Sequence, residues 1–225
     1  LTLKTVYADA NCTTERAAEK LKLTLPVTQE LLQHLYHEKF VEIRGLVGYG
    51  NNRYGMLDRG WQRAQQLLEN NGYIGPAPVS LQAYTDMVLR QSAARNSVAP
   101  DDVRQAMSEL VLTDTTVQTL GLVASSRRSL FLSGPAGNGK TAIAVALHEA
   151  QQGEVWIPHA IEVDSQIIKV FDAHNHQATA VQSVERHDER WVKIKRPIVI
   201  VGGEMTIDTM DLIFSPTVRF YEAPF

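Results

Sequence analysis

The sequence predicts an α/β P-loop fold preceded by a small winged helix-turn-helix domain. A glycine-rich G-x-x-x-x-G-K-T segment runs from Gly134 to Thr141, between an apolar run and an apolar helix pattern. Nearer the N-terminus, two helix patterns precede a hairpin and a third helix pattern, which is the element order of a winged helix. We therefore expect a winged helix-turn-helix at 1–70, a linker and helical lead-in at 71–128, and the N-terminal part of a nucleotide-binding domain at 129–225.

The composition is that of an ordinary globular chain. Hydrophobic residues make up 44% of the 225 residues and charged residues 21%, and the net charge of -3 offers no global attraction for nucleic acid. No apolar run approaches the roughly 20 residues that span a bilayer, and the N-terminal residues lack a signal-peptide pattern. The single cysteine, Cys12, has no partner for an internal disulfide. We expect a cytoplasmic protein without a membrane partner.

The first 70 residues contain the elements of the winged helix. Thr13 or Thr14 is expected to cap the first helix and Thr28 the second, because Thr side chains accept hydrogen bonds from free N–H groups at helix starts. Leu31, Leu32 and Leu35 are expected on the buried face of the second helix. The expected elements are helices 13–21 and 27–38, strand 40–44, a hairpin tip at 45–52, strand 53–57 and a helix 58–69.

The remaining elements follow a break at 70–78, which is rich in Asn, Gly and Pro. The run from Pro197 to Val201 is continuously apolar and β-branched, as is typical of a strand buried on both faces of a parallel sheet. Asp164 and Ser165 suit a two-residue hairpin turn. The expected elements are helices 81–91, 101–112, 115–126 and 140–149, and strands 129–133, 155–163, 166–171 and 197–201.

The P-loop pattern predicts a site for ATP and Mg²⁺. Its glycines let the backbone turn tightly and bring N–H groups close to phosphate oxygens, and the following helix directs its positive end at the same phosphates. Lys140 supplies a charge to the β- and γ-phosphates, and the Thr141 hydroxyl is a ligand for Mg²⁺. The expected binding residues are Gly134, Pro135, Ala136, Gly137, Asn138, Gly139, Lys140, Thr141 and Ala142.

The segment Ser-Gly-Pro-Ala-Gly-Asn-Gly-Lys-Thr-Ala-Ile-Ala resembles the Walker A loop of AAA+ ATPases. The chain also resembles a bacterial group described as ATPases with chaperone activity, whose members carry a winged-helix-like region before the ATPase module. The resemblance implies ATP hydrolysis that remodels a macromolecular partner, in rings that are often hexamers. The passages that carry it are Tyr73 to Val79, Ser129 to Gly134, Gly153 to Pro158, Ile161 to Asp164 and Arg219 to Pro224.

Two further site residues come from the same resemblance. In AAA+ proteins a hydrophobic residue followed by Gly, upstream of the P-loop, often contacts adenine. Ile74 and Gly75, after Tyr73, resemble that pair; the alternative is a simple linker, since Gly75 lies further ahead of Gly134 than is usual.

The sequence provides no clear acid for hydrolysis. A Walker B strand is four apolar residues followed by Asp and usually Glu, which organise the metal and the attacking water. Here Gly202 and Gly203 follow the apolar run, so Glu204 is the one candidate catalytic acid; the alternative is a strand followed by a turn. The resemblance places the Walker B beyond Phe225. We expect a fragment that binds ATP and hydrolyses it poorly.

Two classes of partner are candidates for the winged helix, a protein and DNA. Its second helix offers Gln, Glu and His side chains but no Lys or Arg, and the charges of residues 1–75 nearly balance. Phosphate neutralisation dominates DNA affinity, so we favour docking to a protein client. The alternative is a nucleotide-sensing DNA-binding regulator that uses Arg44 and Arg53 beside the wing. A cluster of Asp172, His174, His176 and His187 fits no standard zinc spacing and is expected to be a solvated loop.

Overall fold

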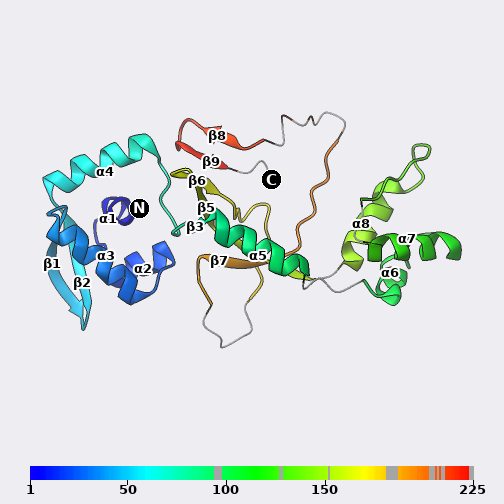
Figure 1. Ribbon diagram of the computed structural model, residues 1–225, viewed down its shortest axis with the longest axis horizontal. Coiled ribbons are helices and arrows are strands. Elements are labelled where there is room, and N and C mark those ends of the chain that lie inside the picture. The colour runs from blue at the N-terminus through cyan, green and yellow to red at the C-terminus, as the bar shows by residue number, and fades with distance from the viewer. Residues whose placement is uncertain are drawn as a thin grey trace. The chain divides into compact units, whose positions relative to one another are not determined.

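The computed structural model shows a mixed α/β chain with several sheets (Figure 1). It describes residues 1–93, 98–126, 129–151, 153–180, 187–202, 206, 208 and 211–222. The chain forms two compact units: the first contains residues 1–88 and 156–225, and the second contains residues 89–155. Residues 129–225, which we expected in one domain, are therefore divided between the two units.

The first unit begins with four helices and a hairpin that enclose a small core. The predicted helices form, and an additional helix, α1, precedes them. The predicted hairpin also forms, but the tip expected at 45–52 was wrong: the strands extend to Gly48 and from Asn51, so only residues 49 and 50 make the turn. The core includes Leu3, Leu32 and Tyr54, each almost completely buried. The elements are α1 (Thr2–Ala8), α2 (Thr14–Leu21), α3 (Leu25–His37), β1 (Val41–Gly48), β2 (Asn51–Met56) and α4 (Asp58–Asn70).

Of the two helix caps predicted from the local sequence, one forms and one does not. Thr13 caps α2 as predicted, and its side chain accepts a hydrogen bond from the N–H of Arg16 at 3.3 Å. The prediction for Thr28 was wrong: α3 begins three residues earlier, and the Thr28 hydroxyl donates to the carbonyl of Thr24 from a buried position inside the helix. Leu31, expected in the core, is 38% exposed, because α3 packs through Thr28 and Leu32 instead.

The rest of the first unit is built on short strands. β3 (Val79–Ser80), β5 (Ala160–Val163), β6 (Gln166–Lys169), β9 (Phe220–Glu222) and β8 (Ile213–Ser215) form one sheet in that order, and β4 (Glu154–Pro158) pairs with β7 (Trp191–Lys195). As predicted, Asp164 and Ser165 form the turn between β5 and β6; both have positive φ, 49° and 65°. Tyr84 and Met87 of α5 (Leu81–Ala93) pack on the core of this sheet region.

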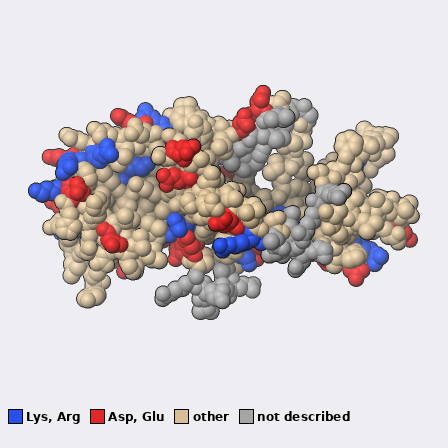
Figure 2. Space-filling model, in the orientation of Figure 1, with Lys and Arg blue, Asp and Glu red and all other residues tan. Residues whose placement is uncertain are grey.

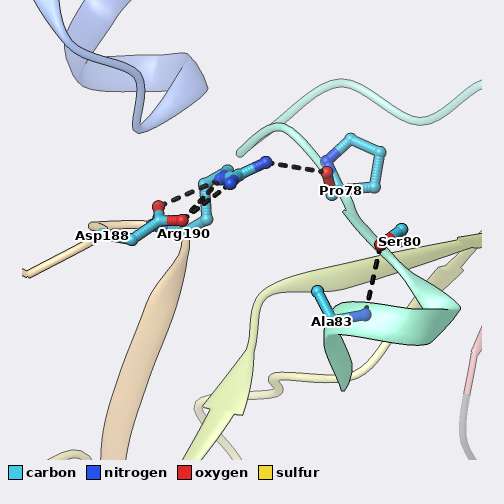
Figure 3. Close-up of polar contacts among 5 residues, drawn as sticks. All are labelled: Pro78, Ser80, Ala83, Asp188 and Arg190. Carbon is cyan, nitrogen blue, oxygen red and sulfur yellow. Dashed lines mark hydrogen bonds and ion pairs between the residues drawn. The ribbon is translucent and has the colours of Figure 1, made fainter. Parts of the chain in front are cut away.

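An arginine ties the start of β7 to the segment before β3. Figure 3 shows the Arg190 guanidinium between Asp188 and Pro78: Nη2 lies 2.7 Å from Asp188 Oδ2, and Nη1 donates to the Pro78 carbonyl at 3.4 Å. Two residues on, Ser80 accepts from the N–H of Ala83 and so satisfies a donor in the first turn of α5. The hydrogen bond from Arg190 to Pro78 joins segments more than 100 residues apart in sequence.

The second unit is a small helical cluster. It contains α6 (Pro100–Ala106), α7 (Asp114–Ser126) and α8 (Lys140–Ala150). α6 ends six residues before the predicted Leu112. Only one face of α8 is buried, through Ile143, Ala146, Leu147 and Ala150, although apolar residues occur on most of its surface. Its buried face packs with Val103 of α6 and Leu120 of α7.

Two predicted strands do not form. Residues 129–133, before the P-loop, are irregular, and Phe131 is 89% exposed. Residues 197–201 are also irregular, with the side chains of Ile198 to Val201 all more than 40% exposed. An apolar β-branched run becomes a buried strand only when neighbouring strands pair with it, and these two runs have no such neighbour among the described residues.

Candidate functional site

The P-loop segment has the backbone conformation that its glycines imply. Gly134, Gly137 and Gly139 have φ values of 151°, 83° and 69°, a region that residues with a Cβ rarely adopt. A Cβ added at Gly137 or Gly139 would meet no atom within 4 Å, so backbone conformation rather than crowding favours glycine at both positions. The segment therefore forms a tight turn directly before α8.

The Lys140 ammonium closes this turn. Its Nζ donates to the carbonyl oxygens of Gly134 at 2.9 Å and Pro135 at 2.8 Å. These are main-chain partners of the loop itself, so the ammonium carries a positive charge that no carboxylate neutralises in these contacts. An anion at the loop would meet this charge at once, because residues 134–139 are all exposed.

The start of α8 has free donors for an anion. Gly139 is the residue before the helix, and no side chain caps the first turn. The first N–H groups of an α-helix have no partner within the helix, so those of Lys140, Thr141 and Ala142 depend on solvent or a ligand. Thr141 and Ala142 are exposed in the first turn, as a metal ligand and a phosphate contact would have to be. The structure thus groups the predicted residues 134–142 on one open loop and helix end.

Ile74 and Gly75 belong to the first unit, and the P-loop belongs to the second. Both residues line a pocket of about 480 Å³ with His159, Phe171 and Phe220. Glycine suits position 75, because a Cβ there would lie 3.1 Å from the Tyr73 hydroxyl. The role of the pair in adenine binding stays a prediction.

Sequence analysis did not identify the other walls of this pocket. Single His and Phe residues near strand ends look like packing residues, and only the sheet brings His159, Phe171 and Phe220 to one place. A signal was present in the spacing of β5 and β6, since a two-residue turn fixes their register and sets Lys169 opposite Ala160.

The candidate catalytic acid Glu204, with Gly203 before it, lies outside the described residues. The remaining weak candidates have local roles. The Asp172 carboxylate accepts from the N–H of His174 and from Asn175 Nδ2, and the His176 ring accepts from the N–H of Asp172. Among the described residues, no group of three His, Cys, Asp or Glu could hold a metal ion.

The surface of α3 differs from that of a DNA-reading helix. Val27 and Leu31, one turn apart, are 45% and 38% exposed. On the hairpin, the Arg44 guanidinium binds the Glu42 carboxylate at 2.9 Å, which offsets its charge. On the face drawn in Figure 2, basic and acidic side chains are interspersed.

Cys12 is completely buried, and this burial raises the pKa of its thiol to about 11. It therefore packs as a small apolar residue and has no reactive thiolate near neutral pH. In the part of the chain that the structure describes, no helix combines the length and apolar character required to cross a bilayer.

No family model matches this sequence, and comparisons with curated proteins and with solved structures find no match. The resemblance to AAA+ ATPases therefore rests on the quoted residues alone.

Proposed function

We propose that this chain binds ATP with Mg²⁺ through residues 134–142. The observation that carries the proposal is the loop itself: three glycines at positive φ precede an uncapped helix start, and the Lys140 ammonium lies among exposed main-chain atoms. Loops of this kind cradle phosphates with backbone N–H groups, and a lysine adds charge at the β- and γ-phosphates. Thr141 supplies the oxygen ligand for Mg²⁺.

In the assembled protein, the bound ATP is hydrolysed and the energy remodels a macromolecular partner. This part of the proposal rests on the resemblance of the P-loop to the AAA+ Walker A loop, which also implies a homo-oligomeric ring. The proposed partner of the N-terminal helices is a cytoplasmic protein client, because α3 exposes the apolar side chains of Val27 and Leu31 and contains no Lys or Arg.

The test is calorimetric binding of Mg·ATP to Lys140→Ala. Removing the ammonium should lower affinity at least tenfold, about 1.4 kcal/mol, because the β- and γ-phosphates lose their one side-chain cation. Lys195→Ala, which removes an exposed lysine of the first unit, should bind like the parent. Thr141→Ala should weaken binding with Mg²⁺ present and leave binding in EDTA unchanged. Parent-like affinity of Lys140→Ala would show that the loop is not a triphosphate site.

A further inference from the structure

A pocket of about 480 Å³ lies wholly within the first unit. Its walls come from four separated segments: the loop 73–76, His159 between β4 and β5, the end of β6 with residues 171–174 after it, and Phe220 of β9. This volume is in the range of small-ligand sites, which combine apolar walls with a few placed polar groups. Since all four segments belong to one compact unit, the pocket is a property of that unit alone.

The pocket walls contain aromatic rings held in fixed orientations. The Tyr73 ring packs edge to face with Phe220, with centroids 5.5 Å apart, and its hydroxyl donates to the Pro76 carbonyl at 2.9 Å. The His159 ring packs edge to face with Phe171 at 5.3 Å. Rings that are already oriented lose little entropy when a planar ligand packs on them.

The charged groups of the pocket are already paired. Lys169 Nζ lies 3.2 Å from a carboxylate oxygen of Glu222, and the Asp172 carboxylate accepts two hydrogen bonds from its own loop. A phosphate or a carboxylate would compete with Glu222 for the lysine and would meet Asp172 at close range. The pairing therefore favours a ligand without charge.

The His159 ring is a polar group of the pocket that is free to bind a ligand. Its N–H donates to the Arg190 carbonyl and its own carbonyl accepts from Val170 and Phe171, so its main chain is fixed. Within the described ranges, no hydrogen bond is made by its ring. Burial, with a smaller contribution from Lys22, lowers the pKa of His159, so the ring is neutral near pH 7 and offers one donor and one acceptor.

We propose that this pocket binds an uncharged planar heteroaromatic ring, the size of a nucleobase or an indole, through ring contacts and hydrogen bonds to His159. The proposal is independent of ATP binding at residues 134–142, because every lining residue lies in the first unit and the P-loop lies in the second.

The probes are adenosine and indole, which carry no phosphate and represent the two sources of such a ring. Binding is measured by calorimetry and by NMR shifts of the His159 and Phe171 rings in the unmodified protein. We expect at least one probe to bind and to shift both rings. His159→Phe keeps a ring and removes the hydrogen bonds, and Phe171→Leu keeps apolar bulk and removes the ring; each should weaken binding at least tenfold.

Two control variants separate this site from others. Tyr49→Ala changes a fully exposed residue at the hairpin tip and should bind the probe like the parent. Lys140→Ala should also bind the probe like the parent, whatever its effect on the affinity for ATP. The proposal is overturned if neither probe shifts the His159 ring, if His159→Phe binds like the parent, or if Lys140→Ala abolishes probe binding. The NMR shifts remain decisive if a pocket variant does not fold.

Discussion

Asp9 is the buried carboxylate of the N-terminal core. Its side chain is 8% exposed and lies 2.7 Å from Lys20 Nζ and 3.0 Å from Arg16 Nη2. It also accepts from the N–H of Asn11. Burial alone would raise the pKa of Asp9, but the hydrogen bond from Lys20, the Asn11 N–H and the nearby Arg16 charge outweigh it and hold the pKa below its ordinary value.

The Asp9 contacts predict acid sensitivity. Because the folded-state pKa lies below the unfolded value of about 3.9, the stabilisation is complete above that value and is lost as pH falls through the folded-state pKa. Asp9→Asn should lower stability at pH 7 by about 1.5–3 kcal/mol, as hydrogen bonds to a charged group are removed. Urea unfolding at pH 7 and pH 3 measures this. Glu30→Gln, on the exposed face of α3, should leave the free energy of unfolding at both pH values unchanged. If the parent and Asp9→Asn lose equal stability between pH 7 and pH 3, the Asp9 contacts are not the source of the acid sensitivity.

At the scale of elements, two helix glycines have opposite surroundings. A Cβ at Gly60 of α4 would overlap the Phe40 carbonyl, so α4 approaches the start of β1 through this glycine. A Cβ at Gly121 of α7 would meet nothing within 4 Å. The same substitution should therefore have opposite effects on the two helices.

Gly60→Ala should destabilise the first unit by about 1–3 kcal/mol, as overpacking does. Gly121→Ala should stabilise the second unit by about 0.5–1 kcal/mol, because alanine loses less backbone entropy in a helix. The chain allows a clean measurement, since all three tryptophans, Trp61, Trp156 and Trp191, lie in the first unit. Tryptophan fluorescence should report the change in Gly60→Ala and not in Gly121→Ala, whereas far-UV circular dichroism should report both. A loss of stability in Gly121→Ala would contradict this reasoning.

The exposed face of α3 leads to a prediction about DNA. The surface of α3 exposes the apolar residues Val27 and Leu31, and Arg44 on the hairpin is paired with Glu42. This surface therefore offers few unpaired cations that could displace the counterions of DNA. We expect the chain to bind duplex DNA no tighter than about 10⁻⁴ to 10⁻⁶ M at physiological salt, the ordinary non-specific range. Fluorescence anisotropy across a salt series measures this, with Arg53→Ala as the comparison for the wing. Nanomolar, sequence-selective binding would favour the DNA-binding regulator instead.

At the scale of the whole molecule, binding and hydrolysis of ATP should separate. The predicted phosphate and metal ligands are together on residues 134–142, but glycines follow the apolar run 197–201 where a Walker B strand has acids. An arginine finger alone contributes about 10³ to 10⁵ in rate, and the sequence patterns identify neither such a residue nor a clear catalytic acid. We expect measurable Mg·ATP binding with phosphate release near background.

Glu204 provides the check on this expectation. Steady-state phosphate release is measured for the parent and for Glu204→Gln, with Glu149→Gln, an exposed acid of α8, as the matched control. Robust turnover in the parent that is lost only in Glu204→Gln would identify Glu204 as the catalytic acid. It would refute our expectation that these residues provide no Walker B acid for hydrolysis.

The sequence by itself determined the features that depend on a few neighbouring residues. The Thr13 cap, the Asp164–Ser165 turn, the course of α7 and α8 and the positive φ values of the P-loop glycines follow from local backbone sterics and hydrogen bonding. Of these features, the glycine φ values and the start of α8 place residues 134–142 on one loop and helix end.

Only the tertiary structure decided the features that depend on distant partners. Residues 129–133 and 197–201 have the composition of buried strands, yet a strand requires hydrogen bonds from a neighbour that its own sequence cannot supply. Leu31 is exposed because the core beside α3 is filled by other residues. His159, Phe171 and Phe220 line one pocket because β6 pairs with β9 as well as with β5. The two-residue turn encodes the pairing of β6 with β5, but no local pattern encodes its pairing with β9, which lies about 50 residues further along the chain.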